Sequence, residues 1–134
     1  MYNQEIGVSP HITEYLDRRW LAKIMRRSGL TINNAVDLTR FHPQPESRGS
    51  VRQELGVPQN AYLVGTVGRL GIEKGYDVLI QAAAQIMPEC EDFYMLIVGD
   101  GNQATPLRRQ AATAGINQWV IFTGARPDVE RLLC

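Results

Sequence analysis

Two cations that could carry chemistry lie in the stretch VGRLGIEKG, which covers residues 67–75. An arginine guanidinium presents a planar fork that matches phosphate oxygens, whereas a lysine ammonium is a mobile point charge. Gly68 lets the backbone turn and approach a ligand closely, and the cations Arg69 and Lys74 follow it. These residue types indicate a site for an anion. From the spacing alone, a glycine turn with two solvated surface cations explains the stretch equally well.

An apolar strand and an amphipathic helix are expected to hold this stretch in place. The strand is the run YLVGTV at Tyr62–Val67, and the helix covers residues 77–87 with an apolar face that includes Leu79, Ile80 and Ala83. The helix begins near Gly75. Its unpaired amides and the positive end of its dipole therefore point into the space of the two cations, which favours an anionic ligand there.

The same alternation continues to the end of the chain. Continuous apolar runs predict strands at Phe93–Val98 and 119–123, and helical patterns cover residues 106–114 and 127–133. Strands that are apolar on both faces and alternate with helices indicate an α/β fold with a Rossmann-like parallel sheet. Ligands of such sheets bind beyond the carboxyl ends of the strands, which here are residues 68–75, 99–102 and 124–126.

The polar residues of the second and third of these loops can also be explained without a ligand. Asp100 lies between two glycines, and a role in the turn is favoured over a role in binding. Arg126 precedes Pro127 and is equally consistent with a solvated surface residue.

The first part of the chain has a different pattern. A helix is expected over residues 12–25, capped by Ser9, with a short strand at 30–32. The stretch 41–49, FHPQPESRG, reads as a polar linker. A short helix is expected over residues 50–56, with its first residue, a serine, as the cap and its last residue, a glycine, as the end.

The composition excludes several classes of protein. The 134 residues are 44% hydrophobic and 21% charged, which is typical of a globular domain, and the formal net charge of zero gives no support for a nucleic-acid binder. Cys90 and Cys134 form neither a disulfide framework nor a metal-binding spacing. No apolar run is long enough to span a membrane, so a cytoplasmic protein is expected. His11 and His42 lack triad or metal partners, so no catalytic and no metal-binding residue is predicted.

A basic helix face has two interpretations. Five cations, Arg18, Arg19, Lys23, Arg26 and Arg27, are interleaved with Trp20 and Leu21. A solvated face is the favoured interpretation. Peripheral contact with an anionic membrane surface is the alternative.

Three segments in this order, VGRLGIEKGYDVLIQAA, LIVGDG and VIFTGAR, resemble the family-four retaining glycosyltransferases of the GT-B fold, the glycosyl transferases group 1. The upstream segment INNAVDLTRFHP looks like the hinge of that family, with Ala35 where the family has glycine. The resemblance implies that residues 1–40 are the tail of the N-terminal acceptor domain and the hinge. Residues 41–60 would then be a linker and short helix, and residues 61–134 the first half of the C-terminal nucleotide-sugar-binding domain.

The resemblance also implies a function, the transfer of a sugar from a nucleoside-diphosphate sugar to a glycosyl acceptor with retention of configuration. In the family, the motif arginine and lysine hold the donor diphosphate, which assigns this role to Gly68, Arg69 and Lys74. The nucleotide-binding candidates are Gly99, Gly124 and Arg126, with the loop 124–126 against the nucleobase. The family implies no cofactor besides the donor substrate and no metal for this step. The alternatives are a non-catalytic nucleotide- or phosphate-binding module and a structural domain that pairs through a sheet edge.

The chain matches only part of this family. The spaced pair of glutamates that contacts the donor sugar is expected beyond residue 134, and most of the acceptor domain is expected before residue 1. A half sheet should leave the strand Tyr62–Val67 with an unpaired edge. We therefore expect the chain by itself to be marginally stable and inactive.

Overall fold

The computed structural model describes residues 4–25, 28–90 and 92–133, and the chain divides into two compact units, Met1–Phe41 and His42–Cys134. The first unit contains β1 (Ile6–Gly7), α1 (Pro10–Arg18), α2 (Trp20–Ile24) and β2 (Leu30–Thr31). β1 pairs with β2 in parallel. The strand β2 was expected within residues 30–32, whereas β1 was not expected.

The helix expected over residues 12–25 is broken in the middle. Arg19 has an extended backbone with φ −63° and ψ 139°, and it separates α1 from α2. Its guanidinium reaches Glu5, with 3.1 Å between Nη1 and Oε1. The predicted cap is confirmed, because the Ser9 side chain accepts a hydrogen bond from the Ile12 amide at 3.3 Å.

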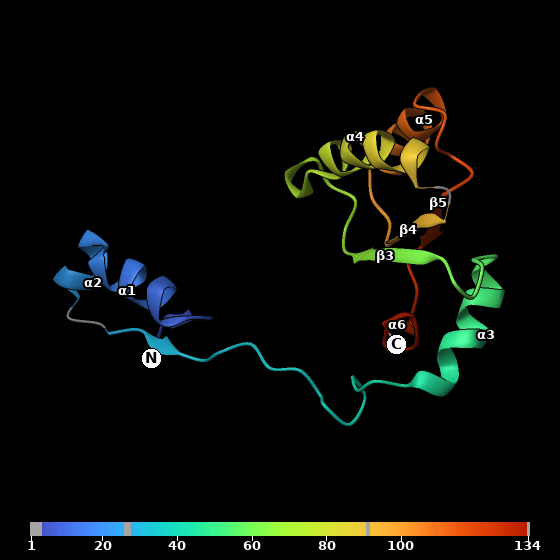
Figure 1. The fold of residues 1–134 in the computed structure, drawn as a ribbon. Coiled ribbons are helices and arrows are strands. Elements are labelled where there is room, and N and C mark those ends of the chain that lie inside the picture. Colours follow the sequence, from blue (N-terminus) through green and yellow to red (C-terminus); the bar gives the residue numbers. More distant parts are fainter. Residues whose placement is uncertain (1–3, 26–27, 91, 134) are drawn as a thin grey trace. The chain divides into compact units, whose positions relative to one another are not determined.

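The second unit is built on a three-stranded parallel sheet (Figure 1). Its strands, in the spatial order β3-β4-β5, are β3 (Tyr62–Val67), β4 (Phe93–Val98) and β5 (Val120–Gly124). One face is covered by α4 (Tyr76–Ile86) and α5 (Ala104–Thr113), and the other by α3 (Pro45–Leu55) and α6 (Val129–Leu132). Two single turns of 3₁₀-helix, η1 (Ile72–Lys74) and η2 (Met87–Glu89), flank α4. The predicted α/β fold with a Rossmann-like parallel sheet is confirmed.

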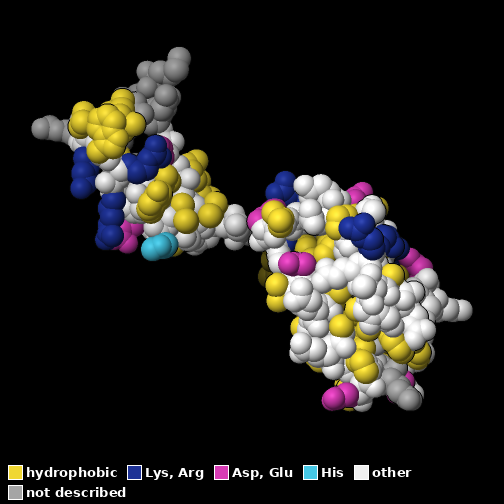
Figure 2. Space-filling model, turned by 90° about the horizontal axis from the view of Figure 1, so that it is seen from above, with side chains coloured by type: hydrophobic (Ala, Val, Ile, Leu, Met, Phe, Trp, Pro, Cys, Tyr) yellow, Lys and Arg dark blue, Asp and Glu magenta, His cyan; other side chains and the backbone are white. Residues whose placement is uncertain are grey.

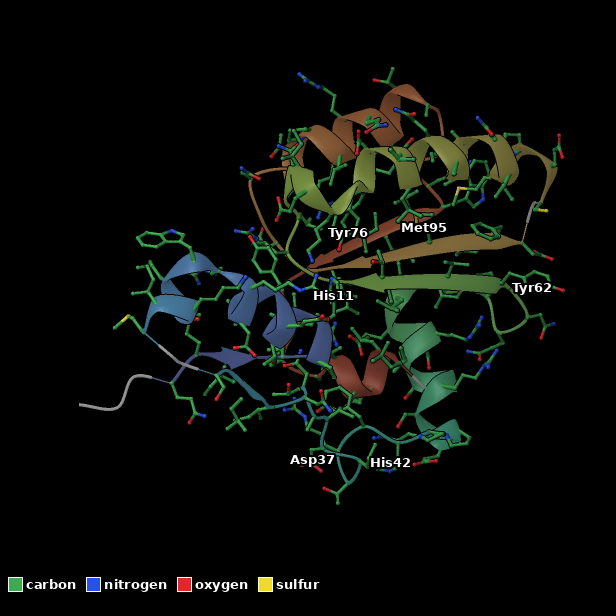
Figure 3. All side chains as sticks on the ribbon, turned by 90° about the vertical axis from the view of Figure 1, so that its left-hand side faces the viewer. His11, Asp37, His42, Tyr62, Tyr76 and Met95 are labelled. Carbon is green, nitrogen blue, oxygen red and sulfur yellow. The ribbon has the colours of Figure 1, made fainter. Side chains whose placement is uncertain are left out.

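The place of β4 in the centre of the sheet explains its apolar sequence. Met95 and Ile97 pack under α4 and α5, against residues such as Ile80, in the larger core cluster. Leu96 and Val98 point to the opposite face and pack against residues of α3 and α6. Successive strand residues face opposite sides of the sheet, and both sides are covered here, so the last four residues of β4 are buried and all apolar. Figure 3 shows Tyr76 and Met95 between the sheet and the layer of α4 and α5.

The boundary expected between a linker at 41–49 and a helix at 50–56 is wrong. Helix α3 begins at Pro45, so half of the expected linker is helical. Proline suits the first position of a helix because the missing amide would have no partner there, and the Gln44 carbonyl accepts the Ser47 amide at 2.9 Å. Ser50 is inside the helix, where its hydroxyl donates to the Ser47 carbonyl at 2.9 Å. The predicted end is confirmed by Gly56 in the left-handed conformation at φ 69°.

Strand β3 lies at the edge of its sheet, as the sequence predicted. Three apolar side chains along it are substantially exposed in this structure: Tyr62 at 75%, and Val64 and Val67 at 45% each. An edge strand presents unpaired backbone groups along one side. The other boundary errors are small: α4 begins one residue before the expected position, α5 two residues before it, and α6 two residues after it. Among the described helices, none combines the length and apolar character needed to cross a membrane.

Candidate functional site

The loop that carries the two cations runs from the end of β3 to the start of α4. After Val67 the chain passes through Gly68 and Arg69, forms the turn η1, and enters α4 at Tyr76. Gly75 joins η1 to α4 in the left-handed conformation, with φ 66°, which glycine adopts without steric cost. The predicted strand–loop–helix arrangement is confirmed. The turn η1, which contains Lys74, was not anticipated.

A second glycine loop supports the first by direct backbone contact. The Leu70 amide donates to the Asp100 carbonyl at 2.9 Å, and the Leu70 carbonyl accepts the Gln103 amide at 3.0 Å. Gly99 has φ 138°, and a Cβ there would overlap the Gly68 carbonyl oxygen and lie 2.9 Å from the carbonyl carbon. Glycine is therefore needed at position 99 to let the two loops pack, whether or not the residue also touches a nucleotide.

Asp100 takes the part in the turn that was favoured for it. Its carboxylate oxygen Oδ1 accepts the Gly101 amide at 2.7 Å. A Cβ at Gly101 would overlap the carbonyl oxygen of Leu70. The segment GDG is thus shaped by its packing under the first loop.

The third loop joins the other two through Gly124. This residue ends β5 with φ 74°, and its carbonyl accepts the Gly99 amide at 2.8 Å. The Gly68 amide in turn donates to the Val98 carbonyl at 2.9 Å. The structure therefore brings Gly68, Gly99 and Gly124 together at the carboxyl ends of three neighbouring strands, which is where open α/β sheets bind ligands.

Tyr76 is a residue of this region that the sequence reasoning missed. Its side chain is only 6% exposed, and a Cβ on Gly68 would lie 2.9 Å from its hydroxyl oxygen. The tyrosine therefore limits the bulk that position 68 can carry. Its position directly after Gly75, at the start of α4, could have indicated from the sequence that it lies near the loop.

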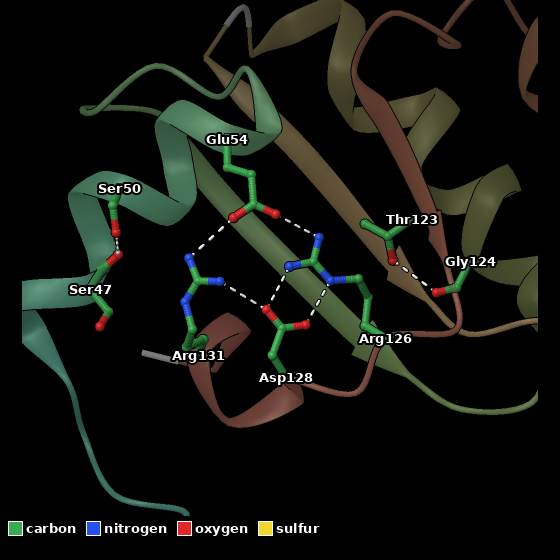
Figure 4. Close-up of polar contacts among 8 residues, drawn as sticks. All are labelled: Ser47, Ser50, Glu54, Thr123, Gly124, Arg126, Asp128 and Arg131. Carbon is green, nitrogen blue, oxygen red and sulfur yellow. Dashed lines mark hydrogen bonds and ion pairs between the residues drawn. The ribbon is translucent and has the colours of Figure 1, made fainter.

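Arg126 belongs to a cluster of four charged side chains, shown in Figure 4. Its Nε and Nη2 atoms donate to the two carboxylate oxygens of Asp128 at 2.8 and 2.6 Å, and its Nη1 donates to Glu54 at 2.6 Å. Arg131 also donates to both carboxylates, at 2.9 Å to Asp128 and 3.1 Å to Glu54. This cluster ties the end of α3 to the loop after β5 and to α6.

The cluster keeps its members charged. The hydrogen bonds with Arg126 hold the pKa of the Asp128 carboxyl well below its usual range, and the bonds to Asp128 and then Glu54 raise the pKa of Arg126. Three of the five N–H groups of Arg126 are thus engaged by carboxylates. The predicted nucleotide contact of Arg126 stays a prediction. What the arrangement shows is that ion pairs connect Arg126 and Asp128 to α3 and α6. Glu54 was missed because it lies 72 positions before Arg126, beyond any local spacing.

The two cations of the first loop differ in their surroundings. Arg69 is paired with Glu73, with 2.5 Å between Nη2 and Oε1. The pKa of the Glu73 carboxyl is lowered, first by a hydrogen bond from its own backbone amide and then by Arg69. Lys74 is exposed, and within the part of the chain that the structure describes it forms no ion pair. Both cations are therefore accessible from solvent next to the start of α4.

The remaining candidate residues do not gather into a second site. Cys90 is exposed, and so are both histidines, His11 and His42, which are labelled in Figure 3; Cys134 lies outside the described residues. Within the described ranges, no group of three His, Cys, Asp or Glu side chains is placed to hold a metal ion.

The basic helix face of the first unit is partly paired. Arg18 and Arg19 form ion pairs with Glu14 and Glu5, and Trp20 is 68% exposed. Arg26 and Arg27 lie outside the described residues. Figure 2 shows many hydrophobic side chains at the surface of this unit. The membrane contact stays a prediction.

Comparisons with known proteins agree on one family. Residues 47–133 match the family described as glycosyl transferases group 1. The 2-deoxystreptamine glucosyltransferase of Streptomyces kanamyceticus is 34% identical over 100 residues, which are 74% of this chain and 26% of that protein. A GDP-mannose-dependent monoacylated alpha-(1-6)-phosphatidylinositol monomannoside mannosyltransferase of Corynebacterium glutamicum is 32% identical over 122 residues, 90% of this chain and 32% of that protein.

A solved structure has a similar fold. The Anabaena protein HepE, in complex with UDP and glucose, superposes with a TM-score of 0.76 at 27% identity, over 98% of this chain and 36% of that one. The chain thus spans about a quarter to a third of the length of the relatives it matches.

Proposed function

This chain belongs to the family of glycosyl transferases group 1, and from that premise we propose that the protein transfers a sugar from a nucleoside-diphosphate sugar to a glycosyl acceptor with retention of configuration. The observation that carries the proposal is the loop after β3. It places Arg69 and Lys74 at the carboxyl ends of the sheet strands, beside the start of α4. Gly68 completes the proposed contact with the donor diphosphate.

The loop suits the chemistry of the leaving group. When the anomeric bond breaks, negative charge grows on the nucleoside diphosphate. Cations held at that position stabilise the transition state more than the ground state, which is the condition for catalysis. The guanidinium of Arg69 binds two phosphate oxygens at once, and the ammonium of Lys74 adds charge without a fixed geometry.

We propose a nucleoside-diphosphate hexose as the donor, and the relatives support this choice. One relative is GDP-mannose-dependent, and the Anabaena neighbour is described with UDP and glucose. We place the nucleobase against residues 124–126 and the nucleotide along Gly99 and Gly124, which the backbone hydrogen bonds join to the first loop. Arg126 borders this surface while its cluster with Asp128 and Glu54 fixes the loop.

We propose the domain division implied by the family as well. Residues 1–40 form the end of the acceptor domain and the hinge, residues 41–60 a connecting segment, and residues 61–134 the first half of the nucleotide-sugar-binding domain. The boundary between the two compact units, at residues 41 and 42, supports this division.

The test is the substitution Arg69→Lys in the intact enzyme. It keeps the charge but removes the fork, so we expect sugar transfer to fall by about 100-fold, as for loss of one donor to a developing charge. Arg109→Lys makes the same chemical change at an exposed site on α5 and serves as the control. Turnover would be measured with UDP- and GDP-hexoses as donors.

Each outcome separates the candidate functions. Unchanged turnover in Arg69→Lys would show that this residue does not hold the diphosphate. Binding of UDP or GDP without any transfer would identify a non-catalytic nucleotide-binding module. Binding of neither nucleotide would refute the proposed function.

A further inference from the structure

The carboxylate of Glu73 lies folded back over the middle of the cation loop. A Cβ built on Gly71 would lie 2.5 Å from its Oε1 atom and 2.7 Å from its carboxyl carbon, so a side chain at position 71 would displace the carboxylate. Gly71 has a φ of −108°, so its backbone does not demand glycine. The glycine at position 71 therefore leaves room for the carboxylate in this position.

Two hydrogen-bond donors hold this carboxylate in place. The Arg69 guanidinium donates through Nη2 to Oε1 at 2.5 Å, and the backbone amide of Glu73 donates as well. Both bonds lower the pKa of the carboxyl, so it is ionised at neutral pH. An anion thus already occupies the space between the arginine fork and the backbone of the loop.

We propose that Glu73 is an internal stand-in for the donor phosphate, which occupies the anion site of the empty protein and is displaced when a diphosphate binds. The inference rests on the proposed function, because it assigns the competitor for the same site. Glu73 engages Arg69 through one nitrogen, whereas a diphosphate offers paired oxygens to the whole fork and a second charge to Lys74.

This exchange would make Glu73 a residue that lowers the affinity of the site for every anion by the same amount and so sets a threshold for binding. An incoming anion gains only the difference between its own contacts and those of the carboxylate that it displaces. Anions with few oxygens gain little. A nucleoside diphosphate gains the fork, the lysine and the contacts of its nucleoside.

The test is the binding of UDP, GDP and inorganic pyrophosphate to Glu73→Gln and to the wild-type chain, measured by calorimetry. An exposed ion pair of this kind contributes modestly, so its removal is expected to tighten binding of all three ligands by about two- to fivefold. Glu89→Gln removes the same charge from an exposed site in η2, before β4 and therefore at the opposite end of the sheet. This control variant should leave affinity unchanged.

A second variant separates displacement from a simple change of charge. Gly71→Ala leaves every charge in place but forces the carboxylate off the loop. We expect it to tighten binding in the wild-type background more than in the Glu73→Gln background, because the two substitutions relieve the same competition.

The outcomes distinguish this inference from the proposed function. Wild-type binding that is unchanged or weakened by Glu73→Gln would overturn the stand-in role and leave the nucleotide site intact. A weakening would make Glu73 a residue that positions Arg69. If none of these proteins binds UDP, GDP or pyrophosphate, both proposals are wrong.

Discussion

Replacing Gly99 by alanine should separate the two loops that build the candidate site. A Cβ at this position would overlap the Gly68 carbonyl oxygen, and the backbone there has φ 138°, which is a region that alanine avoids. Gly68 directly precedes Arg69, so any movement that relieves the overlap also moves the proposed diphosphate ligand. The substitution is therefore expected to affect both stability and binding.

The expected loss of stability follows from two contributions. A non-glycine residue held in this backbone region costs about 1–3 kcal/mol. Relief of the overlap breaks the bond from the Leu70 amide to Asp100 or that from the Gly99 amide to Gly124, each worth about 0.5–1.5 kcal/mol net. With both bonds lost, the free energy of unfolding should fall by about 2–6 kcal/mol, which is a large part of the stability of an ordinary domain.

A matched control is available within the same unit. Gly115 lies just after α5 with φ 73°, and a Cβ there would meet nothing within 4 Å. Gly115→Ala therefore introduces unfavourable backbone geometry without an overlap and should cost only about 1–2 kcal/mol. Urea unfolding followed by circular dichroism would compare the two variants. Hydrogen exchange of the Leu70 amide would report on the loop contact itself, and it should accelerate in Gly99→Ala alone.

The reasoning would be refuted if Gly99→Ala were no more destabilising than Gly115→Ala and the Leu70 amide kept its protection. Such a result would mean that the loops do not pack backbone against backbone. The role of Gly99 would then have to be sought in contact with the nucleotide.

Two further predictions concern the polar contacts of α3. The pKa of Asp128 is lowered in the folded protein, so its contribution to stability is present above its unfolded pKa of about 3.9 and is lost as the pH falls through the lower folded value. Urea unfolding across pH 7 to 3 should therefore show a smaller loss of unfolding free energy with acid for Asp128→Asn than for the wild type. An equal loss in the two proteins would contradict the charged cluster. Arg52 is 6% exposed and donates to the carbonyls of Pro58 and Ala61 at 2.8 and 2.9 Å. Arg52→Met should therefore lower the free energy of unfolding by about 1–3 kcal/mol through the unpaired carbonyls, whereas an unchanged urea midpoint would show that water replaces the side chain.

The strands and the main helices of the second unit were predictable because their signals are local. Tyr62–Val67 and Phe93–Val98 have the bounds that their apolar runs indicated. The start of α3 was missed because the residues FHPQPESRG look like a linker by composition, although Pro45 suits the first turn of a helix. The break at Arg19 was missed because the apolar periodicity continues across it.

The sequence predicted which residues belong to the candidate site better than it predicted the contacts between them. The loop with Arg69 and Lys74 could be located because the end of a parallel strand fixes its place in the sheet. The packing of Gly99 against Gly68 could not be anticipated, since it depends on how two loops 31 positions apart meet in space. The pairing of Arg126 with Glu54 is hidden for the same reason, and both features changed the interpretation of residues that had been assigned to the ligand.

The three glycines Gly68, Gly99 and Gly124 form the base of the candidate site with their backbone groups. The Gly68 amide donates to the Val98 carbonyl and the Gly99 amide donates to the Gly124 carbonyl, so backbone groups alone link the three strand ends. Side chains around these backbone groups can therefore be substituted without breaking the hydrogen bonds. The hydrogen bonds that hold the three loops together are thus independent of the side chains that surround the site.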